Sequence, residues 1–451
     1  MQETTARVQF DKKYLIALVL PLVIEQVLAV TVGMADMIMV SGAGDTAVSG
    51  VSLVNTISNL LIYIFNALAT GGAVVAAQAL GAKKKKTGQI VANQLVLICL
   101  IVSVVISAVC IVFDRAILTL IYGKVEQAVM DQAVTYFFIT GFSFPFIAVY
   151  DGASSLLRSM GKASISLFVS AIMNGLNILF NAIFVFGYNM GIAGVGYGTL
   201  ISRVVAGIVV VFILRNEKYD LHIDKYFRFG WDGQIIGKIL RIGIPSGIDN
   251  GMFQIGKLSV SSLTSTLGTS AIAANAVAGN ITTFLNVPAN AVGMAVLTVI
   301  GQCLGAGEKE QAKHYARRFL LVAYAGAWIM NLSAFFFLNR ITLSWFNLSP
   351  ESNAMALQVM VWFNIISLFI WPSSFTLPNI LRAAGDATFT MTVSVFSMWV
   401  FRVGFCYLMV LGLHQGNLLS IWGGMFLDWL FRSLFFAIRF FKGSWLEKKV
   451  I

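Results

Sequence analysis

The chain has 451 residues, of which 58% are hydrophobic and only 11% are charged, and its mean hydropathy is +0.83. A soluble domain carries about 25% charged residues, so this composition excludes a soluble globular protein and indicates an integral membrane protein. The net charge of +11 would suggest nucleic-acid binding in a soluble protein. Here most lysines and arginines lie in short loops between hydrophobic segments, and in a membrane protein such charges indicate which loops are cytoplasmic.

The first hydrophobic stretch, residues 15–40, is long enough to cross a bilayer, yet it contains Pro21, Glu25 and Asp36. Glu25 and Asp36 are eleven positions apart, which returns them to within about 20° of one face of a helix. A carboxylate inside a span costs roughly 2.5–3.5 kcal/mol, so a functional role is the first expectation for both. The stretch is too long for a cleavable signal peptide, and we expect it to be retained as a span.

Hydrophobic segments recur along the whole chain and predict an all-α membrane protein with twelve transmembrane helices. In chain order they cover residues 14–40, 51–80, 91–113, 132–157, 164–186, 193–214, 239–266, 272–304, 316–338, 356–381, 388–412 and 418–440. Nearly all loop lysines and arginines, including the run Lys83–Lys86, fall in one alternating set of loops. The other set holds only Arg115, Lys124 and Arg340. This asymmetry predicts that both termini are cytoplasmic and that the chain is a multi-pass protein of the cell membrane.

The sequence is also an internal repeat. Six features recur at one constant offset, among them Pro21 and Pro245, Glu25 and Asp249, and Arg158 and Arg382; the others are Asn66 with Asn290, Gln78 with Gln302, and Gly161 with Gly385. The polar segment 216–238 separates the copies, which predicts an amino-terminal lobe at 1–215, a cytoplasmic linker at 216–238 and a carboxy-terminal lobe at 239–451. Because each half has an even number of spans, six, both halves enter the membrane from the same side and the two repeats are parallel. Substrate sites in such transporters usually lie between the two repeats.

Catalytic and nucleotide-binding patterns are absent from the sequence. There is no G-x-x-x-x-G-K-[ST], no G-x-S-x-G and no H-E-x-x-H, and His222, His314 and His414 lie far apart. The four cysteines lie in apolar runs without C-x-x-C spacing and predict small buried hydrophobes. We therefore expect a secondary transporter, not an enzyme, with no cofactor beyond a coupling ion.

Four polar residues on three predicted spans share a similar depth in the amino-terminal lobe. Asp36, Asn177, Asn181 and Thr199 all fall in the outer halves of their helices. A carboxylate with amide and hydroxyl oxygens predicts a site for a proton or a Na⁺ ion. The alternative for the amides and the hydroxyl is hydrogen bonding between helices.

A second set of polar residues is predicted nearer the cytoplasm. Glu25 and its repeat Asp249 would gate the inner opening or attract cations; the alternative is a solvated lining of an inner cavity. Gln254 and the repeated amides Asn66 and Asn290 join this substrate or gating set. Two further pairs within single spans, Asp428 with Arg432 and Asp151 with Arg158, predict internal ion pairs.

These motifs resemble the multidrug and toxic compound extrusion (MATE) family over about residues 10–442. The similar phrases are GMADMIMV in the first span, AQALGA and GQCLGA, LLRSMG, and GIAGVGYGTLIS at residues 191–202. The resemblance implies a V-shaped pair of six-helix lobes and antiport of organic cations against Na⁺ or H⁺. By the same resemblance, Asp36, Asn177 and Thr199 match the family's cation-site residues, whereas Asn181 stands where many members have a second aspartate.

In the NorM-like branch of this family, a glutamate on span seven and an aspartate on span ten form a further cation site. Gln254 takes approximately the first position, and no acid lies between Val361 and Leu381. The resemblance therefore implies that a NorM-like carboxy-terminal cation site is absent here.

The sequence therefore predicts a monomeric multidrug antiporter whose partners are small organic cations or drugs and the lipid bilayer, with no nucleic acid. The alternative is a flippase for a lipid-linked or amphiphilic substrate, which would need a basic or polar groove. An acidic excess in the first span argues mildly against it. A membrane-bound enzyme and a channel fit the short loops and dissimilar lobes less well.

Overall fold

The computed structural model describes residues 9–41, 45–123, 125–224, 230–338, 343, 348–448 and 450–451, and every regular element among them is helical. The described chain divides into two compact units. We call Phe10–Gly247 the amino-terminal unit and Ile248–Ile451 the carboxy-terminal unit. Each is described by itself.

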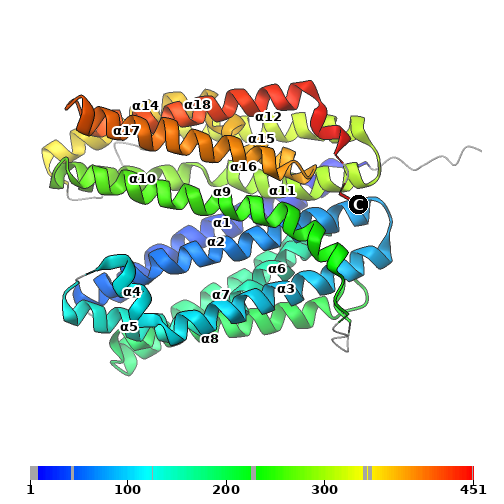
Figure 1. The fold of residues 1–451 in the computed structure, drawn as a ribbon, viewed down its shortest axis with the longest axis horizontal. Helices are drawn as coiled ribbons and strands as arrows, with labels where there is room; N and C mark the ends of the chain where they lie inside the picture. Colours follow the sequence, from blue (N-terminus) through cyan, green and yellow to red (C-terminus); the bar gives the residue numbers. More distant parts are fainter. Residues whose placement is uncertain are drawn as a thin grey trace, which may run out of the picture. The chain divides into compact units, whose positions relative to one another are not determined.

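The amino-terminal unit is a bundle in which α7 packs against α1 and α8, while α2 packs against α3, α5 and α6 (Figure 1). Its helices are α1 (Lys12–Ser41), α2 (Asp45–Gly81), α3 (Lys85–Val112), α4 (Asp114–Tyr122), α5 (Gln127–Gly141), α6 (Phe144–Ser159), α7 (Ala163–Ala182) with the π-helical turn η1 (Ile183–Gly187), α8 (Gly191–Leu214) and the first part of α9 (Gly233–Ser265).

The carboxy-terminal unit begins within α9, and in it α11 packs against α12 and α15, and α18 against α15. Its further elements are α10 (Thr269–Leu285), α11 (Val287–Gly305), α12 (Lys309–Ser333) with η2 (Ala334–Leu338), α14 (Pro350–Phe369), α15 (Trp371–Ala383), α16 (Ala387–Ser397), η3 (Met398–Gly404), α17 (Phe405–Tyr407), η4 (Leu408–Gly412), α18 (Leu418–Lys442) and η5 (Ser444–Glu447).

Each of the twelve predicted spans overlaps a helix, but three of them are broken in two. The breaks separate α5 from α6, α10 from α11, and α14 from α15. In each case the second helix carries a proline in its first turn, namely Pro145, Pro288 or Pro372. Proline has no N–H to donate to the preceding turn and favours the start of a helix. The bend between α5 and α6 is 49°.

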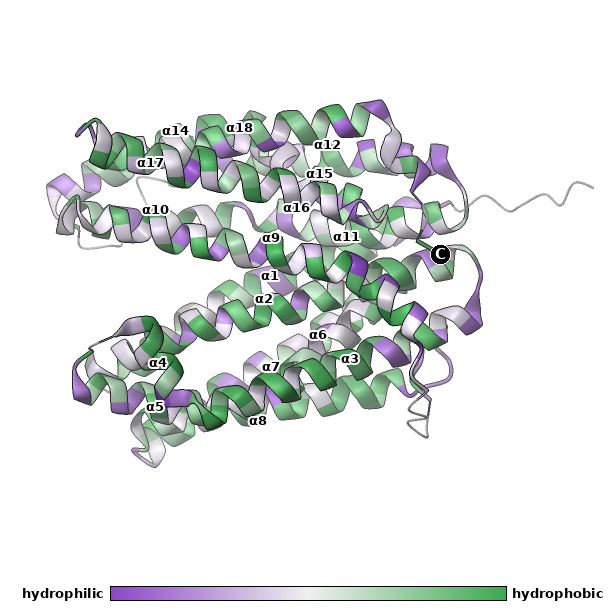
Figure 2. Ribbon diagram, in the orientation of Figure 1, coloured by the Kyte–Doolittle hydropathy of each residue, from purple (hydrophilic) through white to green (hydrophobic). Residues whose placement is uncertain are grey.

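The fold is an all-α integral membrane fold. Among the described residues, ten helices are long and apolar enough to cross a membrane, or eleven if α5 and α6 count as one span. Figure 2 shows hydrophobic residues along most of α3 and α8. The count of twelve crossings and the lobe boundaries remain predictions. Of the three basic residues in the sparse set of loops, Arg115 forms an exposed ion pair with Asp131 at 3.0 Å, and Lys124 and Arg340 lie outside the described residues.

The repeat seen in the sequence recurs in the backbone. Pro21 lies inside α1, and Pro245 lies inside α9. Gly161 follows α6 with a φ of +75°, and Gly385 follows α15 with a φ of +88°. Only glycine adopts this left-handed conformation without a steric cost. The repeated glycines therefore mark the same turn in both halves.

Close contact between α2 and the first part of α9 depends on Gly71. A Cβ atom at this position would lie 2.4 Å from the carbonyl oxygen of Ile239 and 2.9 Å from the backbone nitrogen of Gly243. Both are backbone atoms of α9, so neither can move aside without shifting the helix. A side chain at position 71 would push the two helices apart.

We predict that Gly71→Ala lowers the free energy of unfolding by about 1–3 kcal/mol, as overpacking does in a dense core. Gly175→Ala in α7 is the matched control, because a Cβ there meets no atom within 4 Å. Alanine favours a helix over glycine by up to about 1 kcal/mol, so Gly175→Ala should be neutral or stabilising. Thermal unfolding of the detergent-solubilised protein measures both, and equal melting temperatures would contradict the packing assigned to Gly71.

Candidate functional site

A cavity of about 420 Å³ lies inside the amino-terminal unit. Residues of α1, α2, α5, α6, α7 and α8 line it, and most of the polar ones are amides and hydroxyls. The polar lining residues are Asp36, Asn55, Asn59, Tyr136, Asn174, Asn177, Thr199, Ser202 and Arg203. Three of the four residues predicted to bind the coupling cation thus face one cavity.

Hydrogen bonds connect all four residues of the predicted cation site. The amide of Asn181 donates to Asp36 Oδ1 at 3.1 Å and lies 3.3 Å from the side-chain amide of Asn177. The side-chain amide of Asn177 is in turn 3.3 Å from Thr199 Oγ1, within hydrogen-bond distance. The structure therefore brings Asp36, Asn177, Asn181 and Thr199 together, as the depth argument predicts, although their binding role stays a prediction.

The side-chain amide of Asn177 also faces the carboxylate of Asp36. With its nitrogen turned toward Asp36, this amide donates to Oδ1 at 2.7 Å and to Oδ2 at 3.3 Å, which satisfies both groups, whereas two facing acceptors would repel each other. The carboxylate of Asp36 is therefore contacted by the amides of both Asn177 and Asn181.

A glycine in α8 positions the buried amide of Asn181. A Cβ at Gly198 would lie 2.0 Å from Asn181 Oδ1, so only glycine lets α8 approach α7 at this level. Asn181 is fully buried, and its side-chain oxygen has no hydrogen-bond partner among the described residues. The phrase GIAGVGYGTLIS thus provides both the close packing and, through Thr199, a polar group of the cavity.

The main residue that sequence reasoning misses is Arg203. It lies four residues after Thr199, which is the spacing that places two side chains on one face of a helix, and it lines the cavity with Asp36. Its Nη1 donates to Ser143 Oγ at 2.8 Å, and its charge interacts with Asp36 and Asp151. The cavity therefore contains a fixed positive charge as well as the carboxylate.

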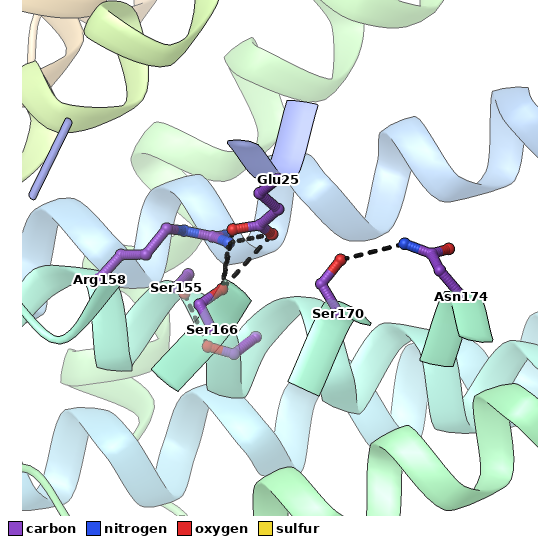
Figure 3. A network of polar contacts seen from close by, with 7 residues as sticks. Glu25, Ser155, Arg158, Ser166, Ser170 and Asn174 are labelled. Atoms are coloured by element: carbon purple, nitrogen blue, oxygen red, sulfur yellow. Dashed lines mark hydrogen bonds and ion pairs between the residues drawn. The ribbon is translucent and has the colours of Figure 1, made fainter. Parts of the chain in front are cut away.

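A second polar cluster in the amino-terminal unit joins α1 to the end of α6 (Figure 3). Arg158 Nη1 lies 3.5 Å from Glu25 Oε1 and donates to Ser166 Oγ at 3.1 Å. Ser166 in turn donates to both carboxylate oxygens of Glu25. The sequence favours Asp151 as the partner of Arg158, but the structure joins Arg158 to Glu25, which is 133 residues away.

The carboxy-terminal unit repeats this cluster with the equivalent residues. Arg382 Nη2 contacts Asp249 Oδ2, again across 133 residues, and Arg382 Nη1 donates to Asn379 Oδ1 at 3.2 Å. Glu25 is 8% exposed and Asp249 is 5% exposed. The alternative of a solvated cavity lining is therefore wrong for both acids, because each is buried against an arginine.

The other predicted residues are placed apart from these clusters. Gln254 is half-buried on α9, Asn66 is half-buried on α2, and Asn290 is exposed on α11. None of the three lines the 420 Å³ cavity. The predicted Asp428–Arg432 pair is wrong: among the described residues, Asp428 forms its ion pair with Arg402, at 3.2 Å.

No group of three or more His, Cys, Asp or Glu side chains able to hold a metal ion occurs in the described part of the chain. The four cysteines are buried and unbridged. The candidate site thus offers one carboxylate and neutral oxygen atoms beside one arginine, a ligand set that a proton or a monovalent cation could use and that is unlike a transition-metal site.

Comparison with known proteins agrees with this geometry. The MatE family model matches residues 21–183 and again residues 245–408, so the two matches begin at the repeated prolines, Pro21 and Pro245. The transporter YisQ of Bacillus subtilis is 29% identical over 99% of this chain and 98% of its own length. A probable multidrug resistance protein NorM of Thermotoga maritima is 27% identical over 98% and 94%.

A solved structure described as MATE in complex with MaL6 superposes with a TM-score of 0.88 at 22% identity, covering 100% of both chains. At this identity the likeness concerns the fold.

The buried pair in the amino-terminal unit yields a prediction about stability. We expect Arg158→Gln to destabilise the protein by about 3–5 kcal/mol, because it leaves Glu25 buried without its partner. Asp220→Asn is the control: its pair with Lys85 is 58% and 79% exposed, and exposed pairs contribute about 0–1 kcal/mol. Thermal unfolding of both variants measures the difference.

The double variant Glu25→Gln/Arg158→Gln completes the cycle. It should lose less stability than the two single variants combined, since removing both charges leaves neither unpaired. Additive losses would mean that the two residues act independently.

Proposed function

Because the chain belongs to the MatE family of membrane transporters, we propose that it is a secondary active efflux antiporter that exports organic cations in exchange for Na⁺ or H⁺. The names of its relatives, such as the multidrug resistance protein of T. maritima, support efflux of drugs. The sequence lacks a Walker A motif, which supports an ion gradient as the energy source. We propose the cell membrane, cytoplasmic termini and a monomer on the sequence arguments alone.

The observation that carries the proposal is the placement of the Asp36 carboxylate in the cavity. Amide and hydroxyl groups and Arg203 line the same cavity inside an apolar bundle, and an ionisable group in such a place is costly unless it is used. In the proposed mechanism, a Na⁺ ion or a proton binds Asp36 in one conformational state more tightly than in another. Only this difference in affinity can shift the balance between the states.

Arg203 gives the exchange a physical basis. Its charge interacts with Asp36, so it offsets the carboxylate when no cation is bound. An incoming Na⁺ ion or proton neutralises Asp36 and leaves the charge of Arg203 less compensated. Ion binding thereby changes the electrostatics of the whole cavity, and the helices that carry these two groups, α1 and α8, are the ones we expect to move.

We assign Glu25 and Asp249 to gating and not to direct attraction of cations. Each carboxylate already has an arginine partner, so neither offers an uncompensated negative charge. Both pairs lie toward the predicted cytoplasmic ends of their helices. When the cytoplasmic side opens, each acid–arginine pair must either move as a unit or separate.

Transport by purified protein in liposomes tests the role of Asp36. We predict that Asp36→Asn abolishes efflux of a fluorescent organic cation driven by an imposed ion gradient, while Asp131→Asn, an exposed surface position, leaves it unchanged. Separate Na⁺ and pH gradients identify the coupling ion. Transport by Asp36→Asn at the wild-type rate would refute the assignment, and wild-type transport that responds to neither gradient would refute antiport.

The second candidate function is a flippase for a lipid-linked or amphiphilic substrate. One observation favours it: the carboxy-terminal unit contains buried arginines, Arg402 and Arg432, and a basic site is what such a substrate would need. Reconstituted vesicles with a fluorescent phospholipid in one leaflet distinguish the two functions. The antiporter should leave the lipid distribution unchanged while it moves the organic cation.

A further inference from the structure

A group of basic residues lies inside the carboxy-terminal unit, apart from both sites described above. Arg402 belongs to the π-helical stretch η3, Arg432 to α18, and Lys257 to α9. Arg402 and Arg432 are each 4% exposed, whereas Lys257 is exposed. We call these three residues the basic cluster.

Positive charge in the basic cluster exceeds the negative charge beside it. Asp428 pairs with Arg402 at 3.2 Å and accepts a hydrogen bond from Ser397 at 2.7 Å. Arg432 forms no ion pair with a described residue, and its Nε and Nη1 find no acceptor there; the same holds for Nη2 of Arg402. Repulsion acts between Arg402 and Arg432 and between Arg402 and Lys257. The cluster therefore presents buried N–H donors and uncompensated positive charge.

Aromatic rings hold the two guanidinium groups by their faces. Arg402 lies 5.1 Å from the ring centre of Phe253, and Arg432 lies 4.8 Å from that of Phe375 and 5.9 Å from those of Phe253 and Phe436. A ring face attracts a guanidinium through its π-electrons and accepts none of its ordinary N–H hydrogen bonds, so the donors can still bind a carboxylate. The rings thus stabilise the two cations without supplying acceptors for their N–H groups.

The exposed member of the basic cluster is Lys257 on α9. Phe253 is half-buried and Lys257 is exposed, and the two are four residues apart on one face of the helix. A Cβ at Gly256 would meet the side chain of Met398 in η3 at 2.3 Å, so η3 packs closely against α9 at this level. The charge of Lys257 interacts with that of Arg402, which connects the exposed member of the cluster to the buried ones.

We propose that Lys257, Arg402 and Arg432 form a binding site for the carboxylate group of an organic substrate. Arg432 and the free edge of Arg402 would bind the carboxylate, Lys257 would attract it, and Phe253 and Phe375 would contact the adjoining apolar part of the molecule. The claim that the basic cluster binds a transported substrate rests on the proposed transport function, whereas the claim that it binds a carboxylate does not. A substrate that carries both an amine and a carboxylate would be an organic cation, as the transport proposal requires, and would also bind the basic cluster through its carboxylate.

The position of the basic cluster argues for an organic carboxylate over a lipid headgroup. Arg432 is the fifteenth residue of the 25-residue helix α18, so about 15 Å of helix separates it from the nearer end. A phospholipid phosphate stays at the membrane surface, beyond that distance. The test includes vesicles with and without anionic lipid, so that a lipid phosphate would reveal itself by competition.

Equilibrium binding to the full chain in nanodiscs tests the proposal without any ion gradient. The probe is radiolabelled 2-naphthoate, and unlabelled 2-naphthamide is its uncharged competitor of the same shape. We expect the carboxylate to bind at least about tenfold more tightly than the amide, as for a charge-assisted pair of hydrogen bonds. Equal affinities would overturn the proposal, as would loss of binding in nanodiscs that contain phosphatidylglycerol, which would identify the occupant as lipid.

Three variants separate binding from folding. Arg432→Met should abolish the preference for the carboxylate, and Arg439→Met should retain it, because Arg439 lies on the same helix but pairs with Asp386. Asp428→Asn releases Arg402 and should bind naphthoate more tightly than wild type, with a larger rise in melting temperature on addition of naphthoate. A preference that survives in Arg432→Met would overturn the proposal.

The same measurement on Asp36→Asn keeps the two proposals distinguishable. The carboxylate preference should persist in this variant whether or not ion-coupled transport depends on Asp36. Failure of antiport would therefore not contradict carboxylate binding by the basic cluster. Equal binding of naphthoate and naphthamide would contradict the basic cluster but not the cation site at Asp36.

Discussion

A charge inside an apolar helix bundle must be neutralised, and this constraint organises both halves of the chain. Each half joins the proline-containing first helix to the fourth span of the repeat through a carboxylate and an arginine: Glu25 with Arg158, and Asp249 with Arg382. Because both partners recur at the same offset, the duplication preserved the contact and not only the residues. Each pair neutralises the carboxylate that it contains, so the remaining buried charges can serve other purposes.

Those remaining charges differ between the halves. In the amino-terminal unit, Asp36 shares a cavity with Asn177, Thr199 and Arg203. The equivalent positions in the second repeat are Val260, Phe401, Gly423 and Leu427, which carry neither charge nor hydrogen-bonding side chains. The carboxy-terminal unit instead buries Arg402 and Arg432 beside one acid. A duplicated scaffold thus carries a cavity with one carboxylate and one arginine in one half and a basic cluster in the other, and this difference underlies the separate sites that we propose for the coupling cation and for the substrate.

Much of this architecture can be predicted from the sequence, because hydropathy and the register of the repeat depend on local composition. The convergence of Asp36, Asn177, Asn181 and Thr199 followed from their depth in consecutive spans. Contacts between distant residues could not be predicted in this way. Glu25 and Arg158 are far apart in the sequence, and nothing in the pattern excluded Asp151 as the nearer partner. Arg203 was recognisable only by its spacing from Thr199, and the pairing of Asp428 with Arg402 depends on how η3 packs against α18. The prolines Pro145, Pro288 and Pro372 were visible in the sequence, but the ends of the helices before them were not.

The central claim is that a cation bound at Asp36 and a substrate bound elsewhere influence each other. Such coupling is reciprocal, so it can be measured from either side by equilibrium binding. The direct measurement is the dissociation constant of an organic cation for the purified protein, titrated across Na⁺ concentration and across pH. We predict that this constant changes with one of the two ions in the wild type and is independent of both in Asp36→Asn. A wild-type constant that is unaffected by either ion, or an equal dependence in the variant, would contradict the account.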